Sequence, residues 1–175
     1  MGKYKTENDA AEEKLTELLQ AYGWRVSTAE SCTGGAVAAA IVNVAGASNV
    51  FEEGFVTYSN AAKRKYLGVK EITLRTLGAV SRDTAAQMCR GCCRASGAEV
   101  GIATTGIAGP GGGTAGQPVG LVYIGCCVGG KVTVKKCRFS GGRSEVRRQS
   151  VETALRLAIQ CVERVTAAAG DGVPV

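Results

Sequence analysis

The sequence contains no histidine among its 175 residues. This absence excludes a Ser-His-Asp triad, a Cys-His nucleophile pair and every metal site that depends on imidazole ligands. Any nucleophilic chemistry must therefore take its general base from a lysine, a tyrosine or a carboxylate.

Aromatic residues are scarce, at 5% of the chain, although the net charge is +6. The basic residues gather near 63–65, 135–138 and 143–148, without interleaved aromatic side chains. Proteins that bind single-stranded nucleic acid stack bases on aromatic side chains, and no helix-turn-helix or zinc-finger spacing occurs here. We therefore expect no nucleic-acid partner, and a small phosphorylated ligand explains the basic clusters equally well.

Long apolar runs are also missing. No window approaches the ~20 uninterrupted apolar residues of a membrane span. The polar stretch 1–11 lacks the apolar core of a signal peptide. These absences predict a soluble, cytoplasmic protein that makes no membrane contact.

Cysteine, in contrast, is plentiful, with eight residues. Without a secretory context we expect no disulfides, and buried cysteine behaves as a small hydrophobic residue. Cys89 and Cys92 have the spacing of half a zinc site, but a second half with matching spacing is absent. We expect no metal and no cofactor.

Hydrophobic periodicity predicts one α/β domain over residues 1–175, with its core at about 8–165. Helices are expected near 8–22, 33–43, 61–67, 71–77, 81–96 and 144–168, and strands near 24–29, 54–59, 98–105, 119–128 and 131–139. The last two strands flank Gly129-Gly130, which is a hairpin signal. Alternating elements early and a hairpin later predict a three-layer sandwich, in which helices cover both faces of a mixed β-sheet.

Ser31 follows the first predicted strand and precedes the glycines of a tight turn, Gly34 and Gly35. We expect Ser31 near the first turn of the next helix, where unpaired N–H groups suit an anion or a developing oxyanion. The structural alternative is that Ser31 is an ordinary helix N-cap and that the glycines serve packing.

Two further segments follow predicted strands, and such segments meet at one edge of an α/β sheet. Tyr58 and Lys63 belong to the first, and a desolvated lysine can lose its proton near neutral pH and activate a serine. The alternative is a solvated Lys63 and a core Tyr58. The second is the glycine-rich loop 106–113, which is either an amide-rich wall for an anionic ligand or a plain turn.

Six motifs occur in order along about residues 8–165: Ala29-Glu30-Ser31-Cys32-Thr33-Gly34-Gly35, Gly54-Phe55-Val56-Thr57-Tyr58-Ser59-Asn60-x-Ala62-Lys63, Gly78-Ala79-Val80-Ser81, Gly106-Ile107-Ala108-Gly109-Pro110-x-Gly112-Gly113, Pro118-Val119-Gly120 and Phe139-x-Gly141-x-Arg143-x-x-Val146-Arg147-Arg148-Gln149. Together they resemble the CinA C-terminal domain family, the nicotinamide-nucleotide amidases, also described as competence/damage-inducible proteins. The resemblance implies hydrolysis of nicotinamide mononucleotide to nicotinate mononucleotide and ammonia. It also implies self-association and a stand-alone form of a domain that elsewhere follows a molybdopterin-binding-like partner.

Carried over by motif position, the resemblance makes Ser31 the nucleophile, Lys63 its base and Tyr58 a supporting proton-transfer group. It places Arg143 and Arg147 as candidates for the substrate phosphate, leaving open which one binds it. The other residues that it implies for substrate binding are Thr33, Gly34, Gly35, Thr105, Gly106 and Gly109.

The sequence departs from the family pattern at Ala61, where an acidic residue is usual, and at Ser140 and Gly142, where a proline and an acidic residue are usual. The first departure lies beside the proposed base, and the second lies in the arginine loop. They leave turnover and substrate preference open. The alternative function is a catalytically silent nucleotide-binding module linked to competence or the DNA-damage response.

Overall fold

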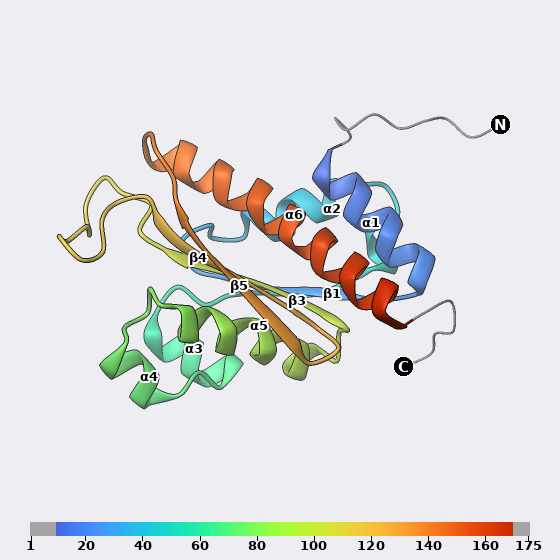
Figure 1. Cartoon of the computed structure of the whole chain (residues 1–175), viewed down its shortest axis with the longest axis horizontal. Coiled ribbons are helices and arrows are strands. Elements are labelled where there is room, and N and C mark those ends of the chain that lie inside the picture. The colour runs from blue at the N-terminus through green and yellow to red at the C-terminus, as the bar shows by residue number, and fades with distance from the viewer. Residues whose placement is uncertain (1–9, 170–175) are drawn as a thin grey trace.

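A five-stranded mixed sheet in the order β2-β1-β3-β4-β5 lies at the centre of the computed structural model, which describes residues 10–169 (Figure 1). The strands are β1 (Val26–Glu30), β2 (Phe51–Val56), β3 (Val100–Gly106), β4 (Leu121–Val128) and β5 (Lys131–Arg138). Strand β1 pairs in parallel with β2 and β3, whereas β4 is antiparallel to both β3 and β5. The carboxyl ends of β1, β2 and β3 therefore meet at one edge of the sheet.

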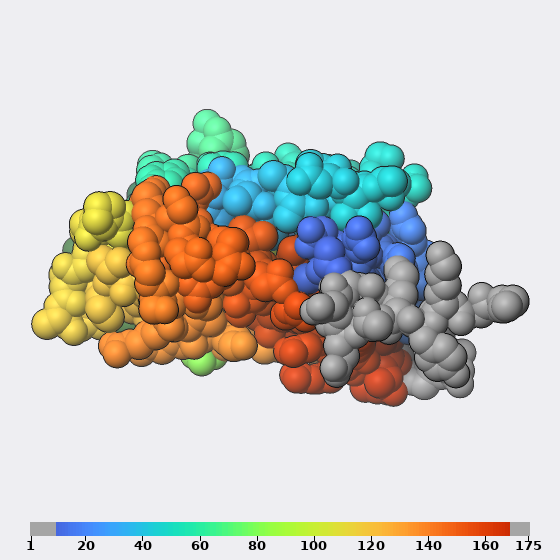
Figure 2. All heavy atoms as spheres, turned by 90° about the horizontal axis from the view of Figure 1, so that it is seen from above, coloured from blue at the N-terminus to red at the C-terminus, as the bar shows by residue number. Residues whose placement is uncertain are grey.

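Helices cover both faces of this sheet, as Figure 1 shows. One face carries α1 (Ala11–Tyr22), α2 (Ala36–Val42) and α6 (Arg143–Ala169), and Figure 2 views the molecule from this side. The other carries α3 (Asn60–Leu67), α4 (Glu71–Thr76) and α5 (Arg82–Ser96), and a short 3-10 helix, Ala47–Asn49, precedes β2. The predicted three-layer α/β sandwich is confirmed.

Each interface between the sheet and a helical layer encloses its own hydrophobic cluster. Central strands β1 and β3 contribute to both clusters, because their side chains are buried on both faces. Edge strand β2 is mostly exposed. Several cysteines fill these clusters as small apolar side chains, and all eight are free thiols.

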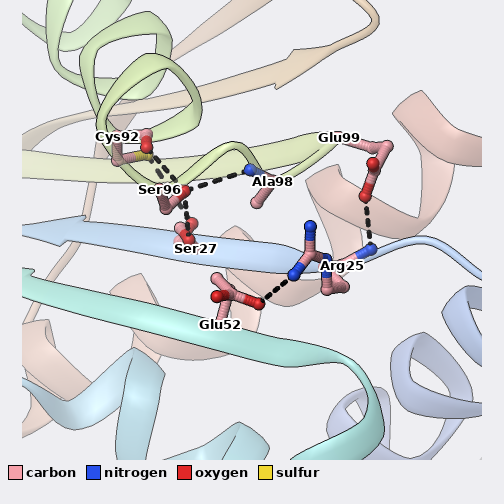
Figure 3. A network of polar contacts seen from close by, with 7 residues as sticks. All are labelled: Arg25, Ser27, Glu52, Cys92, Ser96, Ala98 and Glu99. Carbon is pink, nitrogen blue, oxygen red and sulfur yellow. Dashed lines mark hydrogen bonds and ion pairs between the residues drawn. The ribbon is translucent and has the colours of Figure 1, made fainter.

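Polar contacts fix the amino end of β1, at the end of the strand away from Ser31 (Figure 3). The Arg25 N–H donates to the Glu99 carboxylate at 2.7 Å, and the Arg25 guanidinium pairs with Glu52 at 2.6 Å. Ser27 Oγ donates to Ser96 Oγ at 2.7 Å. These contacts join β1 to β2, to the segment before β3 and to the end of α5.

The differences from the predicted elements have local physical causes. The helix expected over 33–43 begins only at Ala36, because residues 32–35 form a turn that contains two glycines with positive φ. Ser59, rather than Asn60, caps α3 by accepting the Ala62 N–H. The first helix was expected from residue 8, which lies outside the described residues.

The hairpin prediction is confirmed, since Gly129 and Gly130, both with positive φ, join β4 to β5. Among residues 10–169, no helix combines the length and the apolar character needed to cross a membrane.

Candidate active site

A cavity of about 280 Å³ lies where three chain segments converge beyond the sheet edge. The segments follow β1, β2 and β3, and the start of α6 completes the wall. Its lining residues are Ser31, Cys32, Tyr58, Lys63, Ala79, Val80, Thr105, Gly106, Ile107, Ala108, Gly109, Gly111, Gly112 and Arg143. The predicted convergence is therefore confirmed.

Ser31 occupies the first position after β1. Its N–H donates to the Thr104 carbonyl at 3.0 Å, which continues the pairing of β1 with β3. Its carbonyl accepts the Gly34 N–H at 3.2 Å and closes the turn before α2. The main chain thus holds the hydroxyl at the cavity wall from both sides.

The first turn of α2 is not available to a ligand, contrary to the sequence expectation. The buried carboxylate of Glu30 accepts the N–H groups of Gly35, Val37 and Ala38 at 2.8 to 3.0 Å. It therefore satisfies amides that were expected to bind an anion or an oxyanion. Ser31 is likewise not the N-cap of α2, since Gly35 occupies that position.

Lys63 is fully buried, with a relative exposure of 0%, and its amine lies beside Ser31. Nζ is 3.0 Å from Ser31 Oγ, 2.8 Å from the Thr57 carbonyl and 3.3 Å from the Tyr58 carbonyl. Within residues 10–169, no carboxylate forms an ion pair with this amine. The alternative of a solvated Lys63 is thus wrong.

Burial lowers the pKa of Lys63 from its usual 10.5 to about 8, opposed by a weaker effect of the Cys32 thiol. Desolvation disfavours the ammonium form, and no carboxylate in the described part of the chain pairs with the amine to restore it. The pKa of Cys32 itself is raised to about 11, mainly by burial. Of these neighbouring groups, Lys63 is therefore the one that can exchange a proton near neutral pH.

Tyr58 lies at the mouth of the cavity and is 61% exposed, which excludes the alternative of a core side chain. Its hydroxyl accepts a hydrogen bond from Arg143 at 3.3 Å, and the other amino group of Arg143 donates to the Gly109 carbonyl at 3.0 Å. Tyr58 contacts the amine of Lys63 through its main-chain carbonyl. The structure thus brings Tyr58, Gly109 and Arg143 together at one side of the entrance.

The glycine-rich loop also lines the cavity. Gly106 lies against β4, where an added Cβ would come within 2.6 Å of Val122. Gly109 adopts a φ of 85°, which favours glycine. Thr105 lines the cavity, and its hydroxyl donates to the Ala79 carbonyl at 2.7 Å, which fixes the neighbouring part of the wall.

Four residues expected to bind substrate do not line this cavity. Thr33 is buried, and its hydroxyl lies 2.6 Å from that of Thr104. Gly34 and Gly35 belong to the turn before α2, and the Arg147 guanidinium donates to the Thr33 carbonyl at 2.7 Å. Arg147 lines a separate surface hollow between α2 and α6. Of the two candidate arginines, only Arg143 reaches the Ser31 cavity.

Sequence reasoning missed the contribution of Glu30, although the residue was part of a quoted motif. The available signal was a carboxylate at the end of a predicted strand, a few residues before a glycine turn and a helix. It also missed the apolar walls formed by Cys32, Val80, Ile107 and Ala108. Nothing in their residue types marks them as part of a site.

The sequence model of the CinA C-terminal domain matches residues 8–162, nearly the whole chain. The chain belongs to the CinA family.

Two relatives show how this CinA domain compares with longer proteins. A CinA-like protein of Kosmotoga olearia is 51% identical over 152 residues, which are 87% of this chain and 37% of the relative. A putative competence-damage inducible protein of Clostridium perfringens is 52% identical over 144 residues, which are 82% of this chain and 35% of the relative. The chain therefore spans little more than a third of the length of these relatives.

Solved structures of the CinA family have the same fold. The competence/damage inducible protein CihA of Agrobacterium tumefaciens is 44% identical, with a TM-score of 0.83 over 93% of this chain and 99% of its own. A CinA superfamily protein of Klebsiella pneumoniae is 36% identical, with a TM-score of 0.85 over 88% of this chain and 96% of its own.

Proposed function

We propose that this CinA domain is a serine amidase that hydrolyses the carboxamide of nicotinamide mononucleotide to nicotinate mononucleotide and ammonia. The observation that carries the proposal is the pair formed by Ser31 and Lys63. The amine is buried, has a pKa lowered to about 8 and lies 3.0 Å from the serine hydroxyl. A nucleophile in hydrogen-bond contact with a base is the minimal apparatus for acyl transfer.

In the first step, neutral Lys63 accepts the Ser31 proton while Oγ attacks the carboxamide carbon. Two N–H bonds of the neutral amine point to the carbonyls of Thr57 and Tyr58, which leaves its lone pair for the hydroxyl. The Lys63 ammonium then protonates the departing amide nitrogen, and ammonia leaves an acyl ester on Ser31. The two carbonyls orient the amine throughout the cycle.

In the second step, water attacks the ester, passes its proton through Lys63 and releases nicotinate mononucleotide with Ser31 restored. Both steps develop a negative oxygen that needs donors. In the described part of the chain, the N–H groups of Cys32, Ala108 and Gly109 donate to no protein carbonyl. We assign the oxyanion to these groups, since Cys32 follows the nucleophile directly and Ala108 and Gly109 line the same cavity.

Arg143 is the proposed ligand of the substrate phosphate. Arginine binds phosphate bidentately, and Arg143 lies at the cavity entrance with its guanidinium held by Gly109 and Tyr58. The phosphate would then lie outside the cavity mouth while the carboxamide reaches Ser31. Tyr58 would line the path between them, and the proton-transfer role first expected for its hydroxyl gains no support from its contact with Arg143.

The deciding experiment measures ammonia release from nicotinamide mononucleotide by wild type, Ser31→Ala and Lys63→Ala. We expect turnover by wild type and a loss of at least about 10³-fold in both variants, because either change removes a member of the nucleophile-base pair. Lys65→Ala is the matched control, since Lys65 lies exposed on the same helix and should leave turnover unchanged.

Turnover that survives in Lys63→Ala would contradict the mechanism. Tight nucleotide binding without ammonia from any amide would instead support a catalytically silent module, in line with the competence and damage names of the relatives.

We also propose a cytoplasmic location, which suits a chain whose eight cysteines are all free thiols. Self-association stays a prediction, to be checked by sedimentation velocity.

A further inference from the structure

The turn that carries Ser31 has little regular structure of its own. Residues 32–35 contain two glycines in the left-handed region, Gly34 at φ 61° and Gly35 at φ 95°. The helix that follows, α2, has seven residues, and Gly35 at its N-cap offers no side chain for capping. Something outside the turn must therefore fix its conformation.

Glu30 holds the turn from the interior. Oε2 accepts the N–H groups of Gly35 at 2.9 Å and Val37 at 3.0 Å, while Oε1 accepts that of Ala38 at 2.8 Å. The residue is 1% exposed, and its own carbonyl accepts the Thr57 N–H at 2.8 Å. Glu30 thus joins the nucleophile turn to α2 and to the residue whose carbonyl holds the amine of Lys63.

Arg147 holds the same turn from the side of α6. Its guanidinium donates to the Thr33 carbonyl at 2.7 Å, and the Thr33 hydroxyl contacts Thr104 at 2.6 Å on β3. Neither Glu30 nor Arg147 lines the Ser31 cavity. Neither charged side chain therefore reaches the carboxamide in that cavity, but both bond to the main chain of residues 33–38.

We propose that Glu30 and Arg147 are positioning residues that hold Ser31 in line with Lys63 and the substrate carbonyl. This inference rests on the proposed function, but it assigns roles to two residues that take no part in the chemical steps. Effective attack needs the reacting atoms in a narrow geometry, and a displacement of about 1 Å can cost about 10²-fold in rate. Glu30 and Arg147 position Ser31 without contacting the reacting carboxamide, so their loss should lower kcat and leave KM unchanged.

The first test is Glu30→Gln, which keeps the size of the side chain. One oxygen of the carboxylate becomes an NH2 group, so at least one of the three N–H groups loses its acceptor whichever way the amide is turned. We expect kcat to fall at least about tenfold, with KM within about twofold of wild type. The midpoint of the pH–rate profile should not move, because burial and Cys32 are what shift the pKa of Lys63.

A second readout separates this inference from the proposed function. A fluorophosphonate labels activated serines, and mass spectrometry locates the label. The rate of Ser31 labelling should fall in parallel with kcat in Glu30→Gln. If wild type labels at Ser31 yet hydrolyses no pyridine mononucleotide, the proposed function fails, while the labelling rates still decide the positioning roles. The variant Ser96→Ala, which removes a hydroxyl from the network at the end of β1 away from Ser31, controls for lost stability alone and should label at the wild-type rate per folded molecule.

The second test compares Arg147→Ala with Arg148→Ala. Arg148 is an exposed neighbour that pairs with Glu145, so it is a matched control for loss of one positive charge. We expect Arg147→Ala to lower kcat and labelling about five- to tenfold with KM unchanged, and Arg148→Ala to change neither. A raised KM with normal labelling would make Arg147 a phosphate ligand and overturn its positioning role. Normal kcat and labelling in folded Glu30→Gln would overturn the positioning role of Glu30. If Glu30→Gln does not fold, the comparison of Arg147→Ala with Arg148→Ala tests the inference.

Discussion

At the scale of single residues, Lys63 is the group on which the proposed chemistry depends. A fully buried lysine usually pairs with a carboxylate, but in residues 10–169 this amine has only neutral partners, two carbonyls and a hydroxyl. Carbonyls orient an amine without adding the full stabilisation that a carboxylate gives its charged form. Burial of the Lys63 ammonium therefore lowers its pKa toward the working pH, which is what a general base requires.

We predict that the rate of ammonia release rises with pH and levels off above about 8, because Lys63 must be neutral to accept the serine proton. The profile of kcat/KM against pH for the free enzyme measures this midpoint. A midpoint near 10.5 would contradict the assignment, since Lys63 would then act as a cation at neutral pH.

The same shift predicts a pH dependence of stability. Between pH 8 and 10.5 the folded state has lost the Lys63 proton while the unfolded chain still holds it. Stability rises with pH wherever the unfolded state binds more protons. Across this window the free energy of unfolding of wild type should therefore rise relative to Lys63→Met, by up to about 3 kcal/mol. Urea unfolding of both proteins at pH 7.5 and pH 10.5 checks the sign, and a constant difference would contradict it.

At the scale of elements, the close packing of α3 against α5 decides where Lys63 lies. Gly91 of α5 faces the end of α3, and a Cβ at this position would overlap the Leu67 carbonyl. Arg94, also on α5, donates to the same carbonyl at 2.9 Å. The absence of a side chain at Gly91 thus lets α3, the helix that carries Lys63, approach α5 closely.

We predict that Gly91→Ala destabilises the protein by about 1–3 kcal/mol through overpacking, despite the better helix propensity of alanine. It should also lower turnover, because α3 must move away and take Lys63 with it. Urea unfolding and ammonia release measure the two effects. Arg90→Ala, at an exposed position of the same helix, is the control, and equal stability of Gly91→Ala and wild type would contradict the packing argument.

At the scale of the whole molecule, the cavity exists because segments distant in sequence end at one edge of the sheet. Ser31 follows β1, Lys63 lies beyond β2, the glycine-rich loop follows β3, and Arg143 begins α6. Figure 2 shows the loop and the start of α6 side by side at one end of the molecule. Parallel pairing of β1 with both neighbours brings the first three parts together, and the two antiparallel pairings of β4 make β5 end at the same edge, where α6 begins.

We predict that Arg143→Ala raises KM for nicotinamide mononucleotide at least about tenfold with little change in kcat, because a bidentate phosphate contact is lost. The same variant should leave hydrolysis of nicotinamide riboside, which lacks the phosphate, unchanged. Tyr58→Phe, which removes only the hydroxyl that contacts Arg143, should give a smaller rise in KM. A large fall in kcat in Tyr58→Phe would instead restore the proton-transfer role of the hydroxyl.

The sequence by itself determined the layers and the hairpin, and the resemblance to the CinA family predicted that Ser31 and Lys63 act as a pair. Helical and strand periodicities are local, and a chain without histidine leaves few bases for a serine. The family motifs carried the rest of that prediction. The periodicities alone predicted the fold class and the convergence of the three segments that follow β1, β2 and β3.

Only the tertiary structure decided how the charged side chains divide their tasks. Arg143 and Arg147 lie one helical turn apart in sequence, yet one reaches the cavity and the other bonds to Thr33. The Glu30 carboxylate accepts the N–H groups at the start of α2 that were expected to bind a ligand, because its position at the end of β1 directs it toward them. Residue type and spacing do not encode such choices, since each depends on which main-chain group the fold leaves within reach of a long side chain.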